Sequence, residues 1–357
     1  MQTALLLIVG LVLLLGGAEL MIRGAARLAV ATGLSPLVVG LTVVAFGTSA
    51  PELAIGVDAA LSGAPAIAVG NVVGSNIANV LLILGLSALV APLLVARQLI
   101  RLDVPLMLAM SVLIMLLAHD GRIGRVEGGA LVLMAVAYTA FVVRLARRES
   151  AAARAAAAEL PQPAVRVVWW RDLALVVVGL LLLVLGARAL VSAAVSIALG
   201  LGVSELVVGL TVVAVGTSLP EIAASAVATV RGQGEMAVGN VVGSNIFNLS
   251  VVLGASAAAA TGGMPVSVAA RTFDLPVMTA VAFACLPIFF TGHRIARWEG
   301  GLFLGYYVAY TAYLLLDGTG HDAAPLLGRV MVGFVLPLTV VTLAVVTVRA
   351  WHVRRGD

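Results

Sequence analysis

The sequence contains no lysine, a single cysteine and few charged side chains, and each scarcity excludes a class of protein. Only 11% of the 357 residues are charged while 62% are hydrophobic, and a soluble domain cannot hide so much apolar surface because its exterior must be polar. All 21 basic residues are arginines spread between apolar runs, which does not make the single basic face expected of a nucleic-acid partner. The lone Cys285 lies in an apolar run and excludes both a disulfide framework and a thiolate metal site.

Motifs of enzymes and of cleaved leaders are also missing. There is no nucleotide-binding motif and no His-based or thiol nucleophile constellation, so we do not expect an enzyme or a cofactor. No basic stretch precedes the first apolar run, which we therefore interpret as a retained helix rather than a signal peptide. The polar, Ala-rich and Pro-punctuated segment 149–170 is too short to form a regulatory domain of its own.

Apolar runs of the length needed to cross a bilayer, about 20 residues, follow one another along nearly the whole chain. Arginines gather in alternate connections, beginning with Arg23 and Arg27 and including the segment 149–170; this bias predicts an outside N-terminus and a cytoplasmic C-terminus. The use of arginine alone is typical of a GC-rich bacterial genome, so the expected location is a bacterial inner (plasma) membrane, with lipid as the surroundings. The predicted spans are about eleven: 3–22, 36–61, 66–95, 103–118, 127–147, 171–199, 204–230, 236–260, 273–291, 298–316 and 326–348.

The chain contains an internal repeat. Residues 33–85 align without a gap with residues 202–254, so that Glu52 matches Glu221, 169 positions later. Roughly 30 of about 50 aligned residues are identical, far more than shared hydrophobicity would give. Five spans separate corresponding helices, and because five is odd the second copy enters the membrane from the opposite side. Inverted repeats of this kind place a binding site at the midplane between them; the alternative is a duplication kept only for packing.

The repeated segment carries a carboxylate into the apolar region. Glu52 and Glu221 are predicted near the middle of their spans, where an isolated charge costs several kcal/mol and needs a cation, a proton or a partner. Two facing carboxylates match the charge of one divalent ion; two protonated, hydrogen-bonded acids are the alternative. Each glutamate follows a proline, Pro51 or Pro220, whose missing N–H frees a backbone carbonyl four residues earlier. A bound cation can satisfy such groups, although a plain proline kink is also possible.

Neutral oxygen ligands recur on the following helix. Asn71, Ser75 and Asn79 are four residues apart and share one face, and Asn240, Ser244 and Asn248 do the same in the second copy. Amide and hydroxyl oxygens suit Na⁺ or Ca²⁺ rather than soft metals. Interhelical hydrogen bonding is the alternative for any single member. Asp58 has no acidic counterpart, and either lines a pathway or is a solvated end charge.

The paired Gly-Thr-Ser-x-Pro-Glu and Gly-Ser-Asn-Ile-x-Asn blocks, at residues 47–52 and 74–79 and again at 216–221 and 243–248, resemble the calcium/cation antiporter superfamily, specifically prokaryotic sodium/calcium exchangers. The resemblance implies a calcium site of Glu52, Glu221, Thr48 and Thr217. It also implies that sodium binds at Ser49, Ser75, Ser218, Ser244 and the carbonyls of Ala45 and Ala214, with Asn79 and Asn248 lining the centre. Potassium-dependent relatives carry an aspartate at the position of Asn248, so the resemblance argues against potassium co-transport.

We therefore predict an all-α, polytopic membrane protein that exchanges Ca²⁺ for Na⁺ by alternating access, with the first and sixth helices as gates. A proton/calcium antiporter using the same glutamates, a passive cation channel and a non-transporting scaffold are the alternatives. The fold would consist of two inverted five-helix repeats, ten spans, plus an eleventh C-terminal helix that departs from the ten-helix pattern. The expected boundaries are 1–148 for the first repeat, 149–170 for a cytoplasmic linker, 171–318 for the second repeat and 319–357 for the extra helix and tail.

Overall fold

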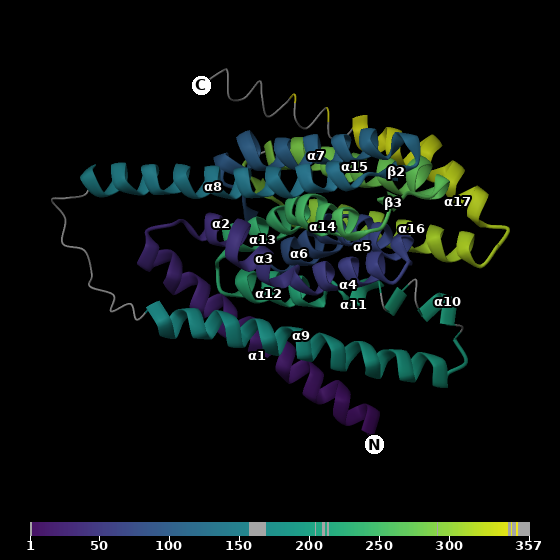
Figure 1. Ribbon diagram of the computed structural model, residues 1–357, viewed down its shortest axis with the longest axis horizontal. Helices are drawn as coiled ribbons and strands as arrows, with labels where there is room; N and C mark the ends of the chain where they lie inside the picture. The colour runs from purple at the N-terminus through teal and green to yellow at the C-terminus, as the bar shows by residue number, and fades with distance from the viewer. Residues whose placement is uncertain are drawn as a thin grey trace.

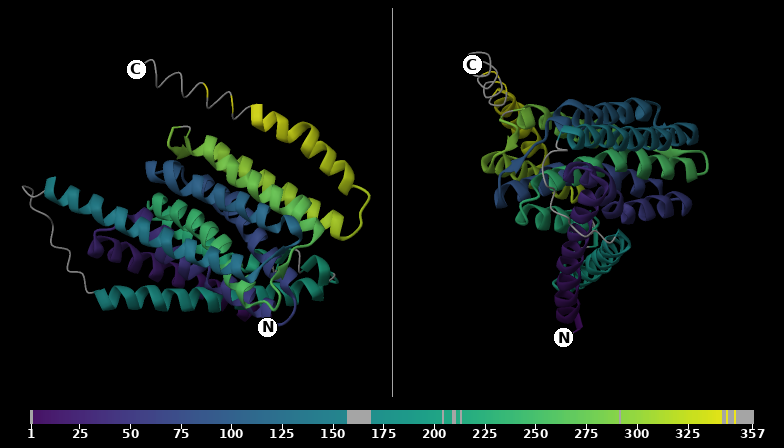
Figure 2. Two further views of the ribbon diagram at one scale, coloured as in Figure 1. Left: turned by 45° about the horizontal axis from the view of Figure 1, so that its top comes forward. Right: turned by 90° about the vertical axis from the view of Figure 1, so that its left-hand side faces the viewer.

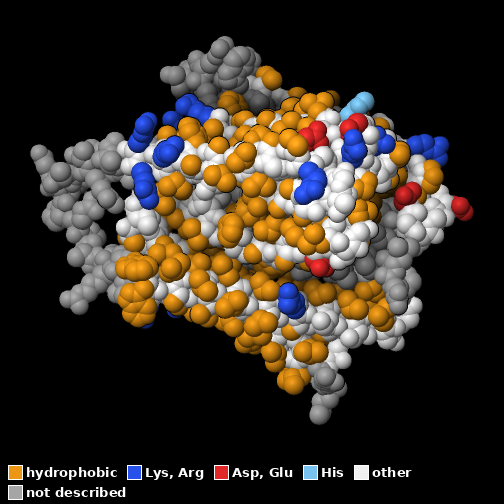
Figure 3. Space-filling model, in the orientation of Figure 1, with side chains coloured by type: hydrophobic (Ala, Val, Ile, Leu, Met, Phe, Trp, Pro, Cys, Tyr) orange, Lys and Arg blue, Asp and Glu red, His pale blue; other side chains and the backbone are white. Residues whose placement is uncertain are grey.

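The computed structural model describes residues 2–156, 169–203, 205–208, 211–212, 214–290, 292–341, 344 and 348. Within these residues, eight helices are long and apolar enough to cross a membrane, or nine when the bent pair Pro36–Thr48 and Ala50–Leu61 counts as one span. Hydrophobic side chains cover much of the face in Figure 3, and most of the basic side chains lie toward its left and right ends. The protein is therefore a multi-pass helical membrane protein.

The first half consists of helices with short π-helical insertions and two very short strands; η4 is a 3₁₀ turn. In chain order its elements are α1 (Gln2–Thr32), α2 (Pro36–Val39), η1 (Gly40–Val44), α3 (Ala45–Thr48), α4 (Ala50–Leu61), α5 (Pro65–Ala78), η2 (Asn79–Leu84), α6 (Gly85–Val90), β1 (Leu93–Leu94), η3 (Leu99–Asp103), α7 (Val104–Leu117), η4 (Ala118–Asp120), β2 (Arg122–Ile123) and α8 (Arg125–Ala156).

The second half repeats this order almost element for element. Its elements are α9 (Trp169–Gly200), α10 (Glu205–Val208), α11 (Ala214–Gly216), α12 (Leu219–Val230), α13 (Gly234–Phe247), η6 (Asn248–Val252), α14 (Leu253–Ala259), β3 (Met264–Pro265), η7 (Ala270–Asp274), α15 (Leu275–Phe290), β4 (Arg294–Ile295) and α16 (Arg297–Gly318), followed by α17 (Ala324–Val330) and η8 (Met331–Val335).

The strands join one half to the other. β1 pairs antiparallel with β4, placing Leu93 opposite Ile295, and β2 pairs antiparallel with β3, placing Ile123 opposite Met264. β1 and β3 occupy equivalent places in the two halves, as do β2 and β4. The two ladders are therefore reciprocal, each taking one strand from each half.

The two repeated central helices form the middle of the molecule. In the spans 65–90 and 234–259, 78% of the most apolar window is buried, against 33% in α1 and 28% in α9. Figure 1 shows α5, α6, α13 and α14 in the centre, with α7, α8 and α15 on one side and α1 and α9 on the other. Figure 2 shows α17 on the outer surface of the bundle, away from α1 and α9. The repeated motifs therefore lie where the surrounding helices exclude lipid and water.

α1 and α9 pack as one antiparallel pair along a seam of glycines. Gly10, Gly17 and Gly24 recur every seven residues on α1, as do Gly179 and Gly186 on α9, and this spacing keeps them on one face of a supercoiled pair. A Cβ atom added at Gly17 would lie 2.7 Å from the Gly179 carbonyl oxygen, and one added at Gly179 would lie 2.5 Å from the Met21 nitrogen. Small residues permit this backbone approach, so the two helices move most easily as a unit.

Helix ends differ from the sequence-based spans. α1 continues to Thr32 and α8 to Ala156, so Arg23 and Arg27 lie on a helix rather than in a connection. The apolar-run criterion stops at charged residues, whereas arginine and alanine are strong helix formers. Residues 157–168 of the predicted linker lie outside the described residues, and α16, although 22 residues long, is not among the spans identified by length and apolarity. The total of eleven spans stays a prediction.

The glycine seam predicts that Gly17→Ala destabilises the protein whereas its neighbour Gly16→Ala does not. A methyl group at Gly17 would strike the Gly179 backbone, while nothing lies within 4 Å of a Cβ at Gly16. Overpacking of this kind costs about 1–3 kcal/mol. Thermal unfolding of the two variants in detergent measures the difference, and equal midpoints would show that the seam is not tightly packed.

Candidate ion-binding site

The second span is broken immediately before its glutamate. α3 ends at Thr48 and α4 begins at Ala50, with a bend of 44° between the two segments. Pro51 lies in the first turn of α4, the position at which a helix tolerates the missing N–H of proline. In the second half α11 ends at Gly216 and α12 begins at Leu219, one residue before Pro220. The proline therefore starts a new helix within the membrane rather than merely kinking an existing one.

This break places each glutamate at a helix N-terminus. Glu52 is in the first turn of α4 and Glu221 in the first turn of α12. The partial positive charge of a helix N-terminus stabilises a carboxylate. The sequence pattern predicted that both glutamates lie near the middle of a span. The structure adds that a new helix begins at each of these positions.

The two carboxylates are buried close to each other without a basic partner. Glu52 is 0% and Glu221 1% exposed, and the two side chains interact electrostatically. The Ser49 hydroxyl donates to Glu221 Oε1 over 3.2 Å. Among the described residues, arginines pair with Glu19 and Asp172 but with neither of these glutamates. Two buried carboxylates in this position require a positive ion or protons.

Two asparagines link the central helices and leave their oxygens unused. Asn79 Nδ2 donates to Asn245 Oδ1 over 2.9 Å, and Asn248 Nδ2 donates to Ser75 Oγ over 3.0 Å. These bonds fix α5 against α13 and orient both amides. The remaining amide oxygens of Asn79 and Asn248 are buried without a hydrogen-bond partner.

Unpartnered oxygens concentrate in this one region of the molecule. A buried polar atom without a partner costs about 1–3 kcal/mol, so several together indicate a ligand. Among the described residues, no group of three or more His, Cys, Asp or Glu side chains is placed to hold a metal ion. The donor set is instead two carboxylates with neutral oxygens, which suits a hard cation. Seven such oxygens belong to the predicted residues: Glu52 Oε1 and Oε2, Glu221 Oε2, Asn79 Oδ1, Asn248 Oδ1, Ser218 Oγ and Ser244 Oγ.

The other predicted residues lie beside these oxygens or contribute backbone. Thr48 and Ser75 are buried, and Thr217 is half-buried. The Ala45 carbonyl accepts the Ser49 N–H over 3.1 Å, so it already has a protein donor. Ala214 begins α11, and its backbone alone is described.

The structure adds contacts to residues outside the ligand set that the resemblance implied. Asn240 Oδ1 lies 3.2 Å from the Thr48 hydroxyl, and its Nδ2 donates to Ser225 Oγ over 3.0 Å. Asn245, which orients Asn79, also belongs to a repeated motif whose other copy holds Asn76. Asn76 and Asn245 could have been found from the sequence, because both copies of the Gly-Ser-Asn block contain this asparagine. Ser225 could not, because its counterpart in the first copy is Gly56.

α9 covers both helix breaks. A Cβ atom added at Gly47 would lie 2.6 Å from the Leu180 side chain, and one added at Gly216 would lie 2.3 Å from Val191. The glycines therefore admit large side chains of α9 directly against the two breaks. Movement of α9 would change how the buried glutamates are covered.

Comparisons with known proteins agree with this arrangement. The chain matches the family described as "Sodium/calcium exchanger protein" over residues 3–144 and 172–316. It is 36% identical over 316 residues to the inner membrane protein YrbG of Escherichia coli (strain K12), covering 87% of this chain and 95% of YrbG. It is 34% identical over 350 residues to the sodium/calcium exchanger MaX1 of Methanosarcina acetivorans, covering 87% and 97%.

A solved structure is similar across almost the whole of its length. This is the sodium-calcium exchanger NCX_Mj soaked with zero Na⁺ and Ca²⁺, which matches with a TM-score of 0.75 and 30% sequence identity over 88% of this chain and 99% of that chain. The resemblance predicted from the two repeated blocks is thus confirmed. The chain belongs to the sodium/calcium exchanger family, a family of membrane antiporters rather than enzymes.

Proposed function

We propose that this protein exchanges Ca²⁺ for Na⁺ across the membrane by alternating access, with the paired glutamates as the shared binding site. The observation that carries the proposal is the set of seven buried, unpartnered oxygens, three from Glu52 and Glu221 and four from Asn79, Asn248, Ser218 and Ser244. Their two carboxylates balance the charge of one Ca²⁺. Because the same oxygens would serve both ions, Ca²⁺ and Na⁺ compete rather than bind together.

The proposed calcium ligands are Glu52 and Glu221 with Thr48 and Thr217. Calcium takes about 6–8 oxygens at 2.3–2.6 Å, which two carboxylates, threonine oxygens and one or two waters supply. Neutral hydroxyls and carbonyls next to the glutamates suit Na⁺, and the proposed donors are Ser49, Ser75, Ser218, Ser244 and the carbonyls of Ala45 and Ala214. Asn79 and Asn248 line the centre between the two sets.

The choice of sodium over protons rests on the donor set. Two carboxylates alone would suffice for proton exchange, whereas serine hydroxyls buried without partners, as at Ser218 and Ser244, are of use to a bound cation. The similar proteins MaX1 and NCX_Mj are named as sodium/calcium exchangers. This similarity supports the same counter-ion here.

We further propose that the halves are two inverted repeats of five spans, residues 1–148 and 171–318, with a cytoplasmic linker at 149–170. The reciprocal strand pairs support a two-fold relation between them. The segment 319–357, which contains α17, lies beyond the family match and is the proposed eleventh helix. The arginine bias and the similarity to an inner membrane protein support a bacterial inner membrane, an outside N-terminus and a cytoplasmic C-terminus.

A calcium flux experiment tests the function. Vesicles containing the purified protein should take up radiolabelled calcium when loaded with sodium, and Glu52→Gln or Glu221→Gln should reduce uptake at least about 100-fold, because a single remaining carboxylate cannot balance a divalent ion at a buried site. The control is Asp103→Asn, which makes the same kind of change at another buried carboxylate, one that accepts hydrogen bonds from Tyr138 and Gln98. This variant should retain calcium uptake.

The gradient identifies the counter-ion. Uptake should follow an outward sodium gradient and ignore potassium. Uptake driven by a pH gradient and indifferent to sodium would establish proton/calcium antiport instead, and flux without any counter-ion dependence would establish a channel.

The two serines beside the glutamates should differ in their effect on stability without calcium. Ser49 donates to Glu221, whereas its counterpart Ser218 has no partner. Ser49→Ala should therefore lower the stability of the calcium-free protein by about 1–3 kcal/mol, and Ser218→Ala should leave it nearly unchanged. Thermal unfolding with a calcium chelator measures this, and equal losses would show that the Ser49 bond does not stabilise the calcium-free state.

A further inference from the structure

The repeat-related helices α4 and α12 differ in how they are covered. Ala54 and Ala223 are the same residue at matching positions, yet Ala54 is exposed and Ala223 only 3% exposed. The next pair repeats the contrast, with Ile55 37% and Ala224 0% exposed. α1 and α9 both pack on α12, and within the described residues neither makes a comparable contact with α4. The structure is therefore closed over one half and open over the other.

An ion-pair cluster lies at the closed edge. Glu19 of α1 pairs with Arg231, which follows α12, through Arg231 Nε to Glu19 Oε2 at 2.6 Å and a second contact. Arg23, one turn further along α1, pairs with the same carboxylate. Glu19 thus joins the movable α1–α9 pair to the turn between α12 and α13.

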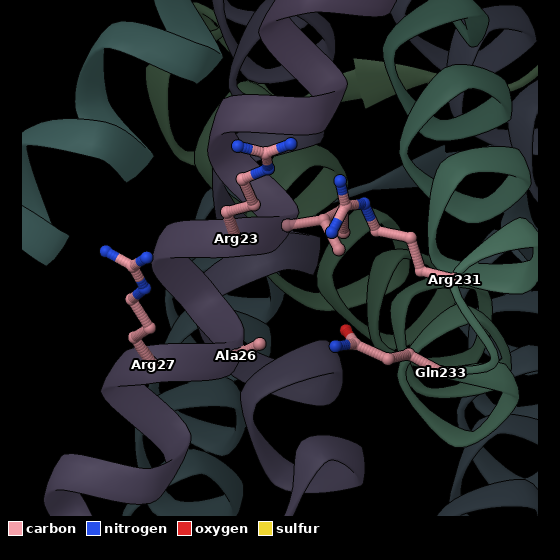
Figure 4. Close-up of a pocket in the computed structure, with 6 residues that line it drawn as sticks. Arg23, Ala26, Arg27, Arg231 and Gln233 are labelled. Carbon is pink, nitrogen blue, oxygen red and sulfur yellow. The ribbon is translucent and has the colours of Figure 1, made fainter. Parts of the chain in front are cut away.

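A hollow of about 320 Å³ lies beside this cluster, between Ile22 and Ala26 of α1 and the residues Arg231 and Gln233. Figure 4 shows Arg231 and Gln233 reaching toward α1 across it, while Arg27 points to the other side. Arg27 faces Asp172 of α9 at 3.6 Å. Each arginine that lines the hollow already pairs with a carboxylate. The hollow is therefore better explained by the contact between α1 and the turn after α12 than by the binding of an anion.

The repeat does not reproduce this ion pair on the other face. At the same 169-residue spacing, Glu19 corresponds to Arg188 and Arg231 corresponds to Ser62. If α9 closed onto α4 as α1 closes onto α12 here, an arginine would meet a serine, and no ion pair would form. The two closed arrangements therefore differ by one charged contact.

We propose that Glu19 and Arg231 form a one-sided latch that favours closure of α1 over α12, and so biases the exchanger toward the conformation described here. The proposal rests on the alternating-access function. Glu19 and Arg231 are positioning residues, because they act through the placement of α1 and touch no transported ion. Their side chains are 30% and 35% exposed, so the expected bias is modest, about two- to fivefold in the ratio of the two closed states.

Two matched cysteine pairs report the two closures. Ala26→Cys with Gln233→Cys spans the hollow at the closed edge, and Val195→Cys with Ala64→Cys occupies the repeat-related positions. Both pairs are made in a Cys285→Ala background and treated in vesicles with a flexible bis-maleimide. The ratio of the two cross-linking rates measures the bias between the two faces.

Arg231→Ser gives the closed edge the residue that the other edge carries. It should lower the ratio of 26/233 to 195/64 cross-linking by about two- to fivefold. Glu19→Gln should shift the cross-linking of the two pairs as Arg231→Ser does. The double variant should show no larger shift than either single variant. Ser62→Arg with Arg188→Glu builds the missing pair and should raise 195/64 cross-linking. Arg27→Gln, which removes the same charge from a contact internal to the α1–α9 pair, should leave both rates unchanged.

Calcium flux in the same vesicles separates this proposal from the proposed function. Unchanged cross-linking ratios in Arg231→Ser and Glu19→Gln, with calcium exchange retained, would overturn the latch and leave the exchanger function standing. Equal shifts in Arg27→Gln would also overturn it, since the effect would then be one of charge alone. Absence of calcium flux in the unlatched and unmodified proteins alike would contradict the exchanger function instead.

Discussion

Two carboxylates buried beside each other in an apolar interior are the constraint on which this structure depends. Neither Glu52 nor Glu221 has a basic partner among the described residues, and removing such charges from water costs several kcal/mol each. The fold offsets part of this cost by beginning a helix at each glutamate. The remainder must come from protons or a bound cation, and the four neutral unpartnered oxygens of Asn79, Asn248, Ser218 and Ser244 favour the hard cation of our proposal.

The same helix breaks account for the surrounding architecture. An interrupted span is tolerated at membrane depth only where protein or a cavity surrounds it, and here α5, α13 and α9 provide that cover. Glycines at the breaks admit Leu180 and Val191 of α9, which brings the tightly packed α1–α9 pair into direct contact with the site. The α1–α9 pair therefore touches both helix breaks through these two side chains.

The sequence predicted which side chains the structure buries together better than it predicted the helix boundaries. Glu52, Glu221 and their neighbours could be recognised because duplication preserved a costly buried carboxylate twice, and the structure brings those residues together. Helix ends were missed at α1 and α8, since charged residues end an apolar run but not a helix. Ser225 could not be found, because its partner position is Gly56 and its role depends on a tertiary contact with Asn240. The covering of α12 and not α4 was also beyond prediction, because aligned sequences imply equal environments.

That inequality bears on how a repeated protein acquires a preferred state. Ligands that recur identically in both halves cannot by themselves favour one conformation over its mirror image. A preference has to arise where the halves differ in sequence and where the moving helices meet the rest of the protein. Two pairs of repeat-related positions satisfy both conditions: Glu19 with Arg188, and Arg231 with Ser62. Of these four residues, only Glu19 and Arg231 are in contact in the observed arrangement. In this duplicated chain the motif residues recur in both halves, whereas the Glu19–Arg231 ion pair has no counterpart in the other half, and on our proposal it is this pair that sets the balance between the two closed states.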